Sequence, residues 1–384
     1  MRIPGNHITL LRNGGEYFLA LEQAIDSACQ NIHVETYIFE PDNTGQRIAD
    51  ALMRAARRGV TVRILVDGFG TRSVPFSFFA ALEQAGAQVI SYRPDRALFN
   101  FRKGRLRRLH RKIALVDGQA GFVGGLNILD DLNGSLSGEP RYDYAVKIEG
   151  PVLADLYRAA DRLWQIVAWW SRGQRHSQRL RPAAVPAPAG RMEAAFLHRD
   201  NVLHRHDIEH AYLEAIYGAK AEILIVNPYF LPGRRFRKAL RDAARRGVKI
   251  TILLQGRADH PFLQLATRAI FTQLLASGID IAEYTRSMLH GKVAVVDGYW
   301  ATVGSSNLDP FSLLLNREAN IVVWDREFAQ KLRDSIQAEC KNAIWFNHEQ
   351  WRKRSRWARL KSWAAYGLIR MAAGMIGIVN DWDQ

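Results

Sequence analysis

The chain has few cysteines, no long apolar run and a deficit of acidic residues. Among its 384 residues only Cys29 and Cys340 are cysteines, and neither has a second Cys or His at metal-ligand spacing. We therefore expect two core-type thiols and no disulfide framework. No run of about 20 uncharged apolar residues occurs, so a membrane span is not expected. The first residues also lack the apolar centre of a signal peptide.

The charge balance is strongly basic. Lys and Arg number 53 against 38 Asp and Glu, which gives a net charge of +15. Such an excess favours anionic partners: nucleic acid, an anionic membrane surface or phosphorylated substrates. Charge alone does not choose among these three classes.

The chain is a tandem repeat of one domain. The stretch AARRGVTVRILVDG, residues 55–68, returns as AARRGVKITILLQG, residues 243–256, and other matched stretches follow in the same order. A period of about 190 residues is far too long for a solenoid and indicates two copies of a whole domain. In each copy, amphipathic helical stretches precede short β-branched runs, which is typical of an α/β domain with a buried sheet. We predict an α/β fold of two tandem domains.

The predicted domain boundaries follow changes in composition. Residues 171–191 are rich in Arg, Pro and Ala and have little periodicity, so we assign them to a linker. The N-terminal domain then spans 1–170 and the C-terminal domain 192–350. Residues 351–384 form a separate tail that begins basic and Trp-rich and ends apolar.

One block of chemically active residues occurs in both copies. HRKIALVDGQAGFVGGLN, residues 110–127, and HGKVAVVDGYWATVGSSN, residues 290–307, place His, Lys, Asp and Asn at the same offsets. Residues two apart on a strand face the same side, so each His shares a face with its Lys. The Gly-rich turn that ends each block gathers backbone N–H groups and an Asn amide, which suits an anion. The candidates are His110, Lys112, Asp117, Gly125 and Asn127 in the first block, and His290, Lys292, Asp297, Ser305 and Asn307 in the second.

These groups suit the cleavage of a phosphodiester. One imidazole can attack phosphorus while the other protonates the leaving oxygen, and the lysines and amides can hold the non-bridging oxygens. Because nucleophile and acid must approach from opposite sides, we expect each half to supply one histidine to a site between the halves. No Asp/Glu cluster or Cys/His set suggests a metal, and we expect neither a metal nor a cofactor.

Four acidic residues extend the candidate site. We assign Asp117 and Asp297 to the catalytic motif, with a role limited to holding turns as the alternative. Asp143 and Glu318 each precede a strand after the histidine block. Either could accept the Nδ1 proton of a catalytic His and fix its tautomer, and an ordinary surface acid is the alternative for both.

The doubled H-x-K-x₄-D motif with a following Gly/Ser-x-Asn resembles that of the phospholipase D superfamily. More narrowly, the chain is similar to bacterial cardiolipin synthases of the short B type, in stretches such as ETYIFEPDNTG and DYAVKIEGP. The resemblance extends from Ile8 to Ala343, nearly the whole chain. It implies two α/β domains related by a pseudo-two-fold axis, with the active site at their interface.

The resemblance also implies a phosphatidyltransferase. One phosphatidylglycerol would donate its phosphatidyl group to a histidine and release glycerol, and the hydroxyl of a second would then attack to give cardiolipin. His110 would be the nucleophile and His290 the general acid and base. A hydrolase, a transferase with another alcohol acceptor, a nuclease of the same superfamily and a binding module without turnover remain alternatives. Nucleic acid is not the expected partner, because the fused halves and the apolar, basic tail favour lipid.

Three segments are candidates for contact with an anionic membrane. Residues 93–112 place Arg and Lys around apolar side chains directly before His110. The tail, 351–384, fits an interfacial amphipathic helix better than a span. Trp169 and Trp170 are the third candidate. The alternatives are a solvated loop, a helix packed on the protein surface and core residues, respectively. We expect a peripheral enzyme on the cytoplasmic side of the cell membrane, and the sequence does not predict its oligomeric state.

Overall fold

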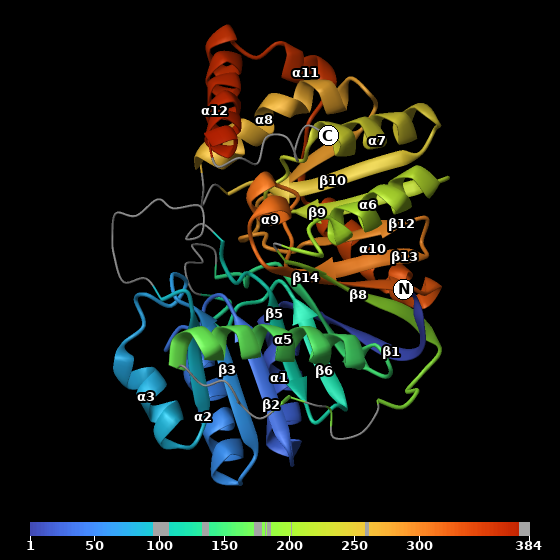
Figure 1. Ribbon diagram of the computed structural model, residues 1–384. Helices are drawn as coiled ribbons and strands as arrows, with labels where there is room; N and C mark the ends of the chain where they lie inside the picture. The colour runs from blue at the N-terminus through green and yellow to red at the C-terminus, as the bar shows by residue number, and fades with distance from the viewer. Residues whose placement is uncertain are drawn as a thin grey trace.

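Two α/β halves follow one another along the chain, which confirms the predicted fold class (Figure 1). The computed structural model describes residues 1–94, 107–132, 138–172, 179–180, 182, 186–200, 202–257 and 261–375. The first half consists of β1 (Ile3–Arg12), α1 (Asn13–Ser27), β2 (Asn31–Thr36), α2 (Asn43–Arg57), β3 (Thr61–Asp67), α3 (Phe76–Gln84), β4 (Gln88–Tyr92), β5 (Lys112–Val116), β6 (Ala120–Gly124), β7 (Tyr144–Glu149) and α5 (Leu153–Arg172).

The second half repeats this order of elements and adds a C-terminal extension. It consists of β8 (Met192–Arg199), α6 (Asp207–Gly218), β9 (Glu222–Asn227), α7 (Arg234–Arg245), β10 (Lys249–Gln255), α8 (Pro261–Leu275), β11 (Asp280–Tyr284), β12 (Val293–Val296), β13 (Trp300–Gly304), α9 (Pro310–Leu314), β14 (Glu318–Trp324) and α10 (Arg326–Cys340). The extension consists of β15 (Ile344–Trp345), α11 (His348–Arg352) and α12 (Arg356–Met375).

The strands form a sheet whose order repeats about its middle. Among the described residues it has 15 strands, in the order β4-β3-β2-β5-β6-β7-β1-β8-β14-β13-β12-β9-β10-β11-β15. β1 and β8 pair antiparallel at the centre, with Ile3 opposite Ala194. Outward from this junction both halves have the same strand order, so a pseudo-two-fold relation connects them.

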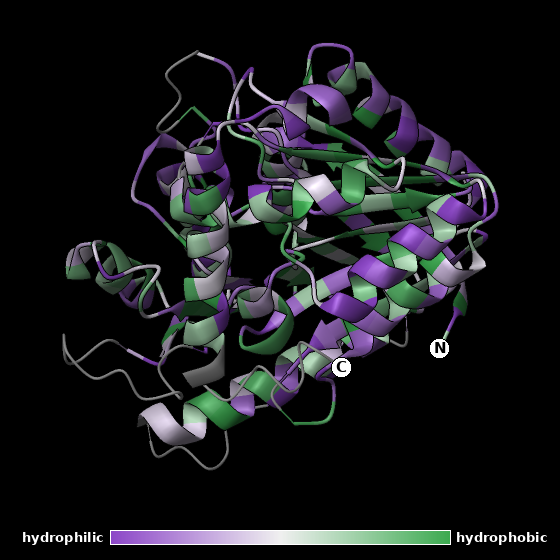
Figure 2. Ribbon diagram, turned by 90° about the horizontal axis from the view of Figure 1, so that it is seen from above, coloured by the Kyte–Doolittle hydropathy of each residue, from purple (hydrophilic) through white to green (hydrophobic). Residues whose placement is uncertain are grey.

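Alternation along the strands sends side chains into two different cores. In β5, Ala114 packs on the side of α1 and α2, whereas Ile113 and Leu115 join a core shared by both halves. β12 repeats the pattern, with Val293 and Val295 in the shared core. Figure 2 shows the central strands as mainly hydrophobic and polar residues on the outer helices. Each buried aliphatic side chain of this kind stabilises the fold by about 1.5–3 kcal/mol, so the shared core fixes one half against the other.

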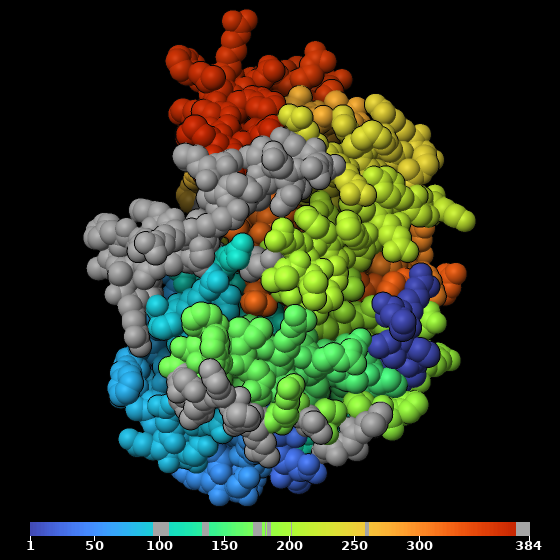
Figure 3. All heavy atoms as spheres, viewed as in Figure 1, coloured from blue at the N-terminus to red at the C-terminus, as the bar shows by residue number. Residues whose placement is uncertain are grey.

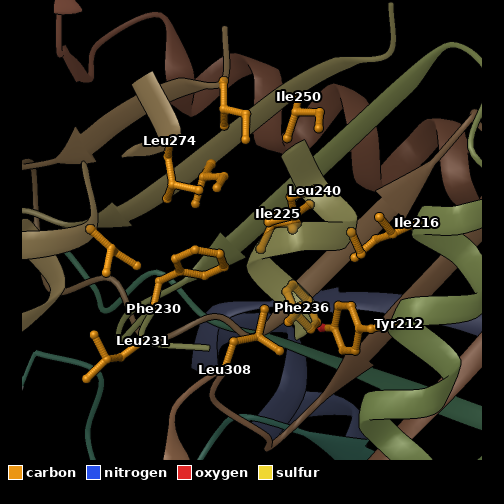
Figure 4. Packing of buried hydrophobic residues seen from close by; sticks show 14 of the residues in the cluster. Tyr212, Ile216, Ile225, Phe230, Leu231, Phe236, Leu240, Ile250, Leu274 and Leu308 are labelled. Atoms are coloured by element: carbon orange, nitrogen blue, oxygen red, sulfur yellow. The ribbon is translucent and has the colours of Figure 1, made fainter. Parts of the chain in front are cut away.

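The outer core of the second half is closed by the C-terminal extension. Figure 4 shows Phe230, Phe236 and Leu274 within this core. α12 packs on α8 and adds Tyr366 and Ile369 to it. The tail therefore includes a helix that packs on the protein, and the boundary predicted between residues 350 and 351 falls inside α11.

Parts of three predicted segments lie outside the described residues. These parts are 95–106 of the basic stretch, 173–178, 181 and 183–185 of the linker, and 376–384 of the tail. Within the part of the chain that the structure describes, no helix has the length and apolar character needed to cross a membrane.

Asp117 and Asp297 hold turns, and we correct their assignment to the catalytic motif. Each follows the last residue of its strand in the left-handed conformation, with φ of 51°, and its carboxylate accepts three backbone N–H bonds. The histidines lie beyond the opposite ends of β5 and β12, so neither aspartate reaches them. The donors precede or begin the neighbouring strand: Cys29, Gln30 and Asn31 for Asp117, and Lys220, Ala221 and Glu222 for Asp297.

Asp117→Ala should lower the free energy of unfolding by roughly 2–4 kcal/mol, because three N–H groups lose their acceptor and alanine disfavours a positive φ. Asp117→Asn should cost less, since Asn tolerates this conformation and keeps one acceptor oxygen. Urea unfolding measures both changes. Variants that fold should keep the enzymatic rate of the parent. Loss of activity in a stably folded Asp117→Ala protein would instead show that Asp117 has a catalytic role.

Candidate active site

Each histidine segment is held by the opposite half of the chain. The residue before each histidine forms an isolated β-bridge with the other half. The His110 N–H donates to the Arg317 carbonyl at 2.9 Å, and the His290 N–H donates to the Tyr142 carbonyl at 2.8 Å. Contact between the two halves therefore helps to fix the backbone at both histidines.

Each histidine also contacts an acid of the opposite half. His110 Nδ1 lies 3.0 and 3.1 Å from the two carboxylate oxygens of Glu318, the first residue of β14. His290 Nδ1 lies 2.6 Å from Asp143, which directly precedes β7. Both acids are buried, so neither is an ordinary surface acid. A carboxylate accepts the Nδ1 proton, so Nε2 of each ring keeps its lone pair.

Burial makes both imidazoles neutral at pH 7. Desolvation is the main cause that lowers the pKa of His290 to about 4; the Lys292 charge adds to it and Asp143 opposes it. Burial likewise lowers the pKa of His110, against the attraction of Glu318. Burial acts to raise the pKa of Asp143, but His290 and Lys292 outweigh this effect and lower that pKa on balance. Each ring is thus a neutral base that donates its Nδ1 proton to a carboxylate.

Both lysines of the motif are buried beside their histidines. Lys112 Nζ donates to the His110 carbonyl at 2.7 Å, and Lys292 Nζ donates to the His290 carbonyl. Burial, together with the nearby Lys292 charge, lowers the pKa of Lys112 to about 7, although Glu318 acts to raise it. A bound anion would favour the charged form of Lys112, so this site is suited to phosphate.

The two histidines line one pocket of about 400 Å³. Asn127 and Asn307 line it too, so both predicted amide donors reach the same space as the imidazoles. The remaining lining residues were not predicted from the sequence. Of these, Arg108 stands two residues before His110 and within the basic stretch 93–112, and Arg141 stands two residues before Asp143. The full missed set is Tyr37, Ile38, Arg108, Arg141, Tyr229, Met288 and Asn316.

Gly125 and Ser305 do not line the pocket, and their backbone N–H groups donate within the fold, to the Tyr144 and Ala319 carbonyls respectively. We therefore correct their predicted role in binding phosphate. A Cβ at Gly125 would collide with the Asp143 carboxylate, so glycine leaves room for that acid. Ser305 is buried and donates its hydroxyl to Glu318. Both residues therefore position an acid: the shorter Asp lies beside Gly, and the longer Glu lies beside Ser.

Two further side chains at strand ends hold the histidine segments. Asp67, the last residue of β3, accepts the Leu109 N–H at 2.8 Å. Gln255, the last residue of β10, accepts the Leu289 N–H at 3.1 Å. These positions end the matched stretches ILVD and ILLQ, so the repeat pointed to them. The sequence could not show which backbone they contact, because that contact is made only in the folded chain.

The buried Lys112 and Lys292 contact the histidine carbonyls without lining the pocket. The pocket itself combines two neutral imidazoles with two amides and with Arg108 and Arg141. It can present Nε2 of one ring to phosphorus, Nε2 of the other to a leaving oxygen, and N–H donors to the remaining oxygens. Within the described ranges, no group of three or more His, Cys, Asp or Glu side chains is placed to hold a metal ion.

Two like α/β halves whose H-x-K-x₄-D blocks meet in one pocket define a protein of the phospholipase D superfamily. The chain belongs to the family described as "Cardiolipin synthase, PLD-like domain", which matches residues 21–164 and 212–339. This membership confirms the resemblance seen in the sequence, and it makes the chain an enzyme of the phosphatidyltransferase type.

Individual relatives agree with this assignment. The chain is 40% identical to Cardiolipin synthase B of Shigella flexneri over 381 residues, which cover 97% of this chain and 90% of that protein. It is 39% identical to Cardiolipin synthase B of Escherichia coli K12 over the same lengths. The solved phosphatidylserine synthase of Haemophilus influenzae superposes with a TM-score of 0.70 over 97% of this chain and 95% of that one. At 15% identity, that likeness shows the fold alone.

Sulfate should bind more weakly as the pH rises through about 7, because Lys112 has its pKa there and loses its positive charge above it. Sulfate keeps its own charge across this range, so calorimetric titration at a series of pH values isolates the protein's contribution. Lys112→Gln should bind sulfate weakly at every pH. A parent affinity that stays constant across neutral pH would mean that Lys112 does not titrate in this range.

Proposed function

We propose that this chain synthesises cardiolipin by transferring a phosphatidyl group from one phosphatidylglycerol to another, with release of glycerol. The crossed pairing of His110 with Glu318 and of His290 with Asp143 carries the proposal, because it sets two neutral imidazoles in one pocket. The similarity to Cardiolipin synthase B over nearly the whole chain supports phospholipid as the substrate.

In the first half-reaction His110 is the nucleophile. Its Nε2 attacks phosphorus, an N–P bond forms, and the P–O bond to the glycerol headgroup breaks. Glu318 stabilises the positive charge that develops on the ring. His290 gives a proton to the leaving oxygen, so glycerol departs as a neutral alcohol. For this step the anionic phosphodiester must raise the pKa of His290 above the value of about 4 that burial gives it.

In the second half-reaction the hydroxyl of another phosphatidylglycerol enters on the side that glycerol left. His290, now neutral, takes the hydroxyl proton while the oxygen attacks phosphorus. The N–P bond breaks and His110 returns to its neutral form. Asp143 holds Nδ1 of His290 through both steps. The net proton transfer runs from the acceptor hydroxyl to glycerol. His290 therefore ends the cycle protonated, as it was in the substrate-bound state, and the proton that it took up from solvent on binding is released when the product leaves.

The lysines and asparagines stabilise the transferring phosphoryl group. Lys112 and Lys292 are buried cations beside the two histidines, and Asn127 and Asn307 present amides to the pocket that the histidines line. Together they bind the non-bridging oxygens, on which charge develops as the N–P bond forms. Loss of one such donor typically lowers kcat by about 10²–10³-fold.

Arg108 and Arg141 supply charge for the second phospholipid. The acceptor carries its own anionic phosphodiester close to the attacking hydroxyl. Arg108 lies on the His110 segment, and Arg141 directly precedes Tyr142, whose carbonyl holds His290, so one guanidinium flanks each side of the pocket. Water as the acceptor would make no use of this charge, which favours transfer to a lipid over hydrolysis.

We place the enzyme at the cytoplasmic face of an anionic membrane, as a peripheral protein. Its net charge of +15 supports attachment to anionic lipid, which is enriched in the cytoplasmic leaflet. Phosphatidylglycerol is itself anionic, so the surface that attracts the protein also contains its substrate.

His110→Ala and His290→Ala should each lower kcat by about 10³-fold or more, because one variant lacks the nucleophile and the other the general acid. His7→Ala is the matched control, since His7 is exposed on β1 and should leave the rate unchanged. Circular dichroism checks that all three variants fold. Substantial turnover in either active-site variant would show that the two histidines do not share one reaction.

Product analysis on vesicles tests the reaction itself. Phosphatidylglycerol labelled in its headgroup glycerol should give cardiolipin and free labelled glycerol in equal amounts. Phosphatidic acid as the only lipid product would make the chain a hydrolase. After phosphatidylethanolamine is added to the same vesicles, cardiolipin and free labelled glycerol should still form in equal amounts if phosphatidylglycerol is both donor and acceptor. Cardiolipin formed with release of ethanolamine in place of glycerol would make phosphatidylethanolamine the donor.

A further inference from the structure

The large apolar side chains that face solvent are concentrated around one end of the molecule. We call this the pocket end: β3 and β10 finish there at the side chains that hold the histidine segments. Apart from the terminal Met1, the most exposed such residues in the described chain are Phe76, Trp170 and Trp357, at 83%, 76% and 73%. Phe76 begins α3, the helix that follows β3. Figure 1 shows α3 and α12 on the same side of the molecule.

α5 brings two exposed tryptophans to the pocket end. The turn before them places Trp164 in one buried cluster with Leu109, which directly precedes the histidine of the first block. Trp169 and Trp170 follow, with ring centroids 4.7 Å apart, and both are exposed. This pair lies on the surface near the site and is not part of the core.

The loop after β8 brings two more exposed apolar side chains to the pocket end. The last residue of that strand, Arg199, lies opposite Glu318 in the antiparallel pair of β8 and β14, so the strand ends beside the site. Val202 and Leu203 come shortly after it and are both exposed. Their N–H groups donate to the Asp200 carboxylate at 2.8 and 2.9 Å, which fixes the backbone that carries these two side chains.

α12 carries apolar stripes on two opposite faces. Tyr366 on the inner face accepts a hydrogen bond from Arg237, in the first turn of α7, at 3.0 Å. α7 begins a few residues after Tyr229, which lines the pocket, so the middle of α12 lies near the pocket end. The outer face carries four exposed apolar side chains at helical spacing, which packing on α8 does not require. We call them the outer stripe: Trp357, Leu360, Leu368 and Met371.

Basic residues surround the outer stripe of α12. From His348 to Met375 the sequence has seven Lys or Arg and a single Glu. Figure 3 shows this segment, in red, projecting from the upper half. Tryptophan, aliphatic side chains and clustered positive charge on an amphipathic helix are the combination that binds an anionic bilayer interface. The charge of the chain as a whole favours the same partner over a neutral apolar one.

We propose that the pocket end is a membrane-docking face, in which Phe76, Trp170, Val202, Leu203 and the outer stripe of α12 enter the interface of an anionic bilayer. Docked in this way, the pocket lies at the level of the headgroups, and two phospholipids reach it without leaving the membrane. The proposal rests on the proposed function only in taking phospholipid as the substrate.

Vesicle sedimentation with the full chain tests this face. The variant Trp170→Ser/Trp357→Ser removes two exposed side chains of the docking face, neither of which lines the pocket. The matched control, Tyr217→Ser/Tyr299→Ser, removes two exposed aromatic side chains near the Asp297 turn, at the opposite end of the sheet. Both are compared with the parent on vesicles of phosphatidylglycerol and phosphatidylcholine.

The docking variant should bind these vesicles about tenfold more weakly than the parent or worse, because two interfacial tryptophans are lost, and the control should bind like the parent. All three proteins should turn over short-chain, monomeric phosphatidylglycerol at the same rate, which also shows that the variants fold. Equal vesicle binding by docking variant and parent would overturn the proposed face. A parent that does not turn over even the short-chain lipid would instead overturn the proposed function.

Discussion

The site depends on two short crossings in which each half of the chain holds the histidine of the other. At each crossing a backbone carbonyl fixes the histidine N–H, and the very next residue is the acid that contacts Nδ1: Arg317 then Glu318 for His110, and Tyr142 then Asp143 for His290. One bridge therefore sets both the position and the tautomer of a ring. A hydrogen bond to a charged group contributes about 1.5–3 kcal/mol, so separating the halves would cost both pairs and the chemistry with them.

Burial of these crossings explains the charge states that the reaction needs. The histidine side chains are only 14% and 16% exposed, and desolvation lowers the pKa of His290 to about 4 and that of Lys112 to about 7. A neutral imidazole is a ready nucleophile. The charge of Lys292 disfavours the protonated form of Lys112, so the site favours a bound anion. A phosphodiester is such an anion and favours the protonated forms of Lys112 and His290. Substrate binding and the protonation of the general acid are thus linked.

The sequence predicts the parts that repeat, because a repeat makes a pattern visible. The two α/β halves and the presence of His110, His290, Asn127 and Asn307 in one site all follow from the matched blocks. The same pattern gave wrong roles to four residues. Asp117 and Asp297 each accept three backbone hydrogen bonds at the ends of their strands away from the histidines. Gly125 and Ser305 position the two acids and do not bind phosphate. Asp143 and Glu318 were predicted to orient a histidine, and the structure places each at a histidine Nδ1. Which acid contacts which histidine could not be predicted, nor could the contacts of Asp67, of Gln255 and of the inner face of α12, because these join distant segments that no local pattern encodes.

The crossed pairing is tested most directly by the tautomers of the two histidines, read from their ring nitrogen shifts in protein labelled with nitrogen-15 histidine. The parent should carry the proton on Nδ1 of both histidines. Glu318→Gln should then alter the signals of His110 while leaving those of His290 nearly unchanged, and Asp143→Asn should do the reverse. If each acid instead altered the histidine of its own half, or if both substitutions left both rings unchanged, the crossed architecture of the site would be contradicted.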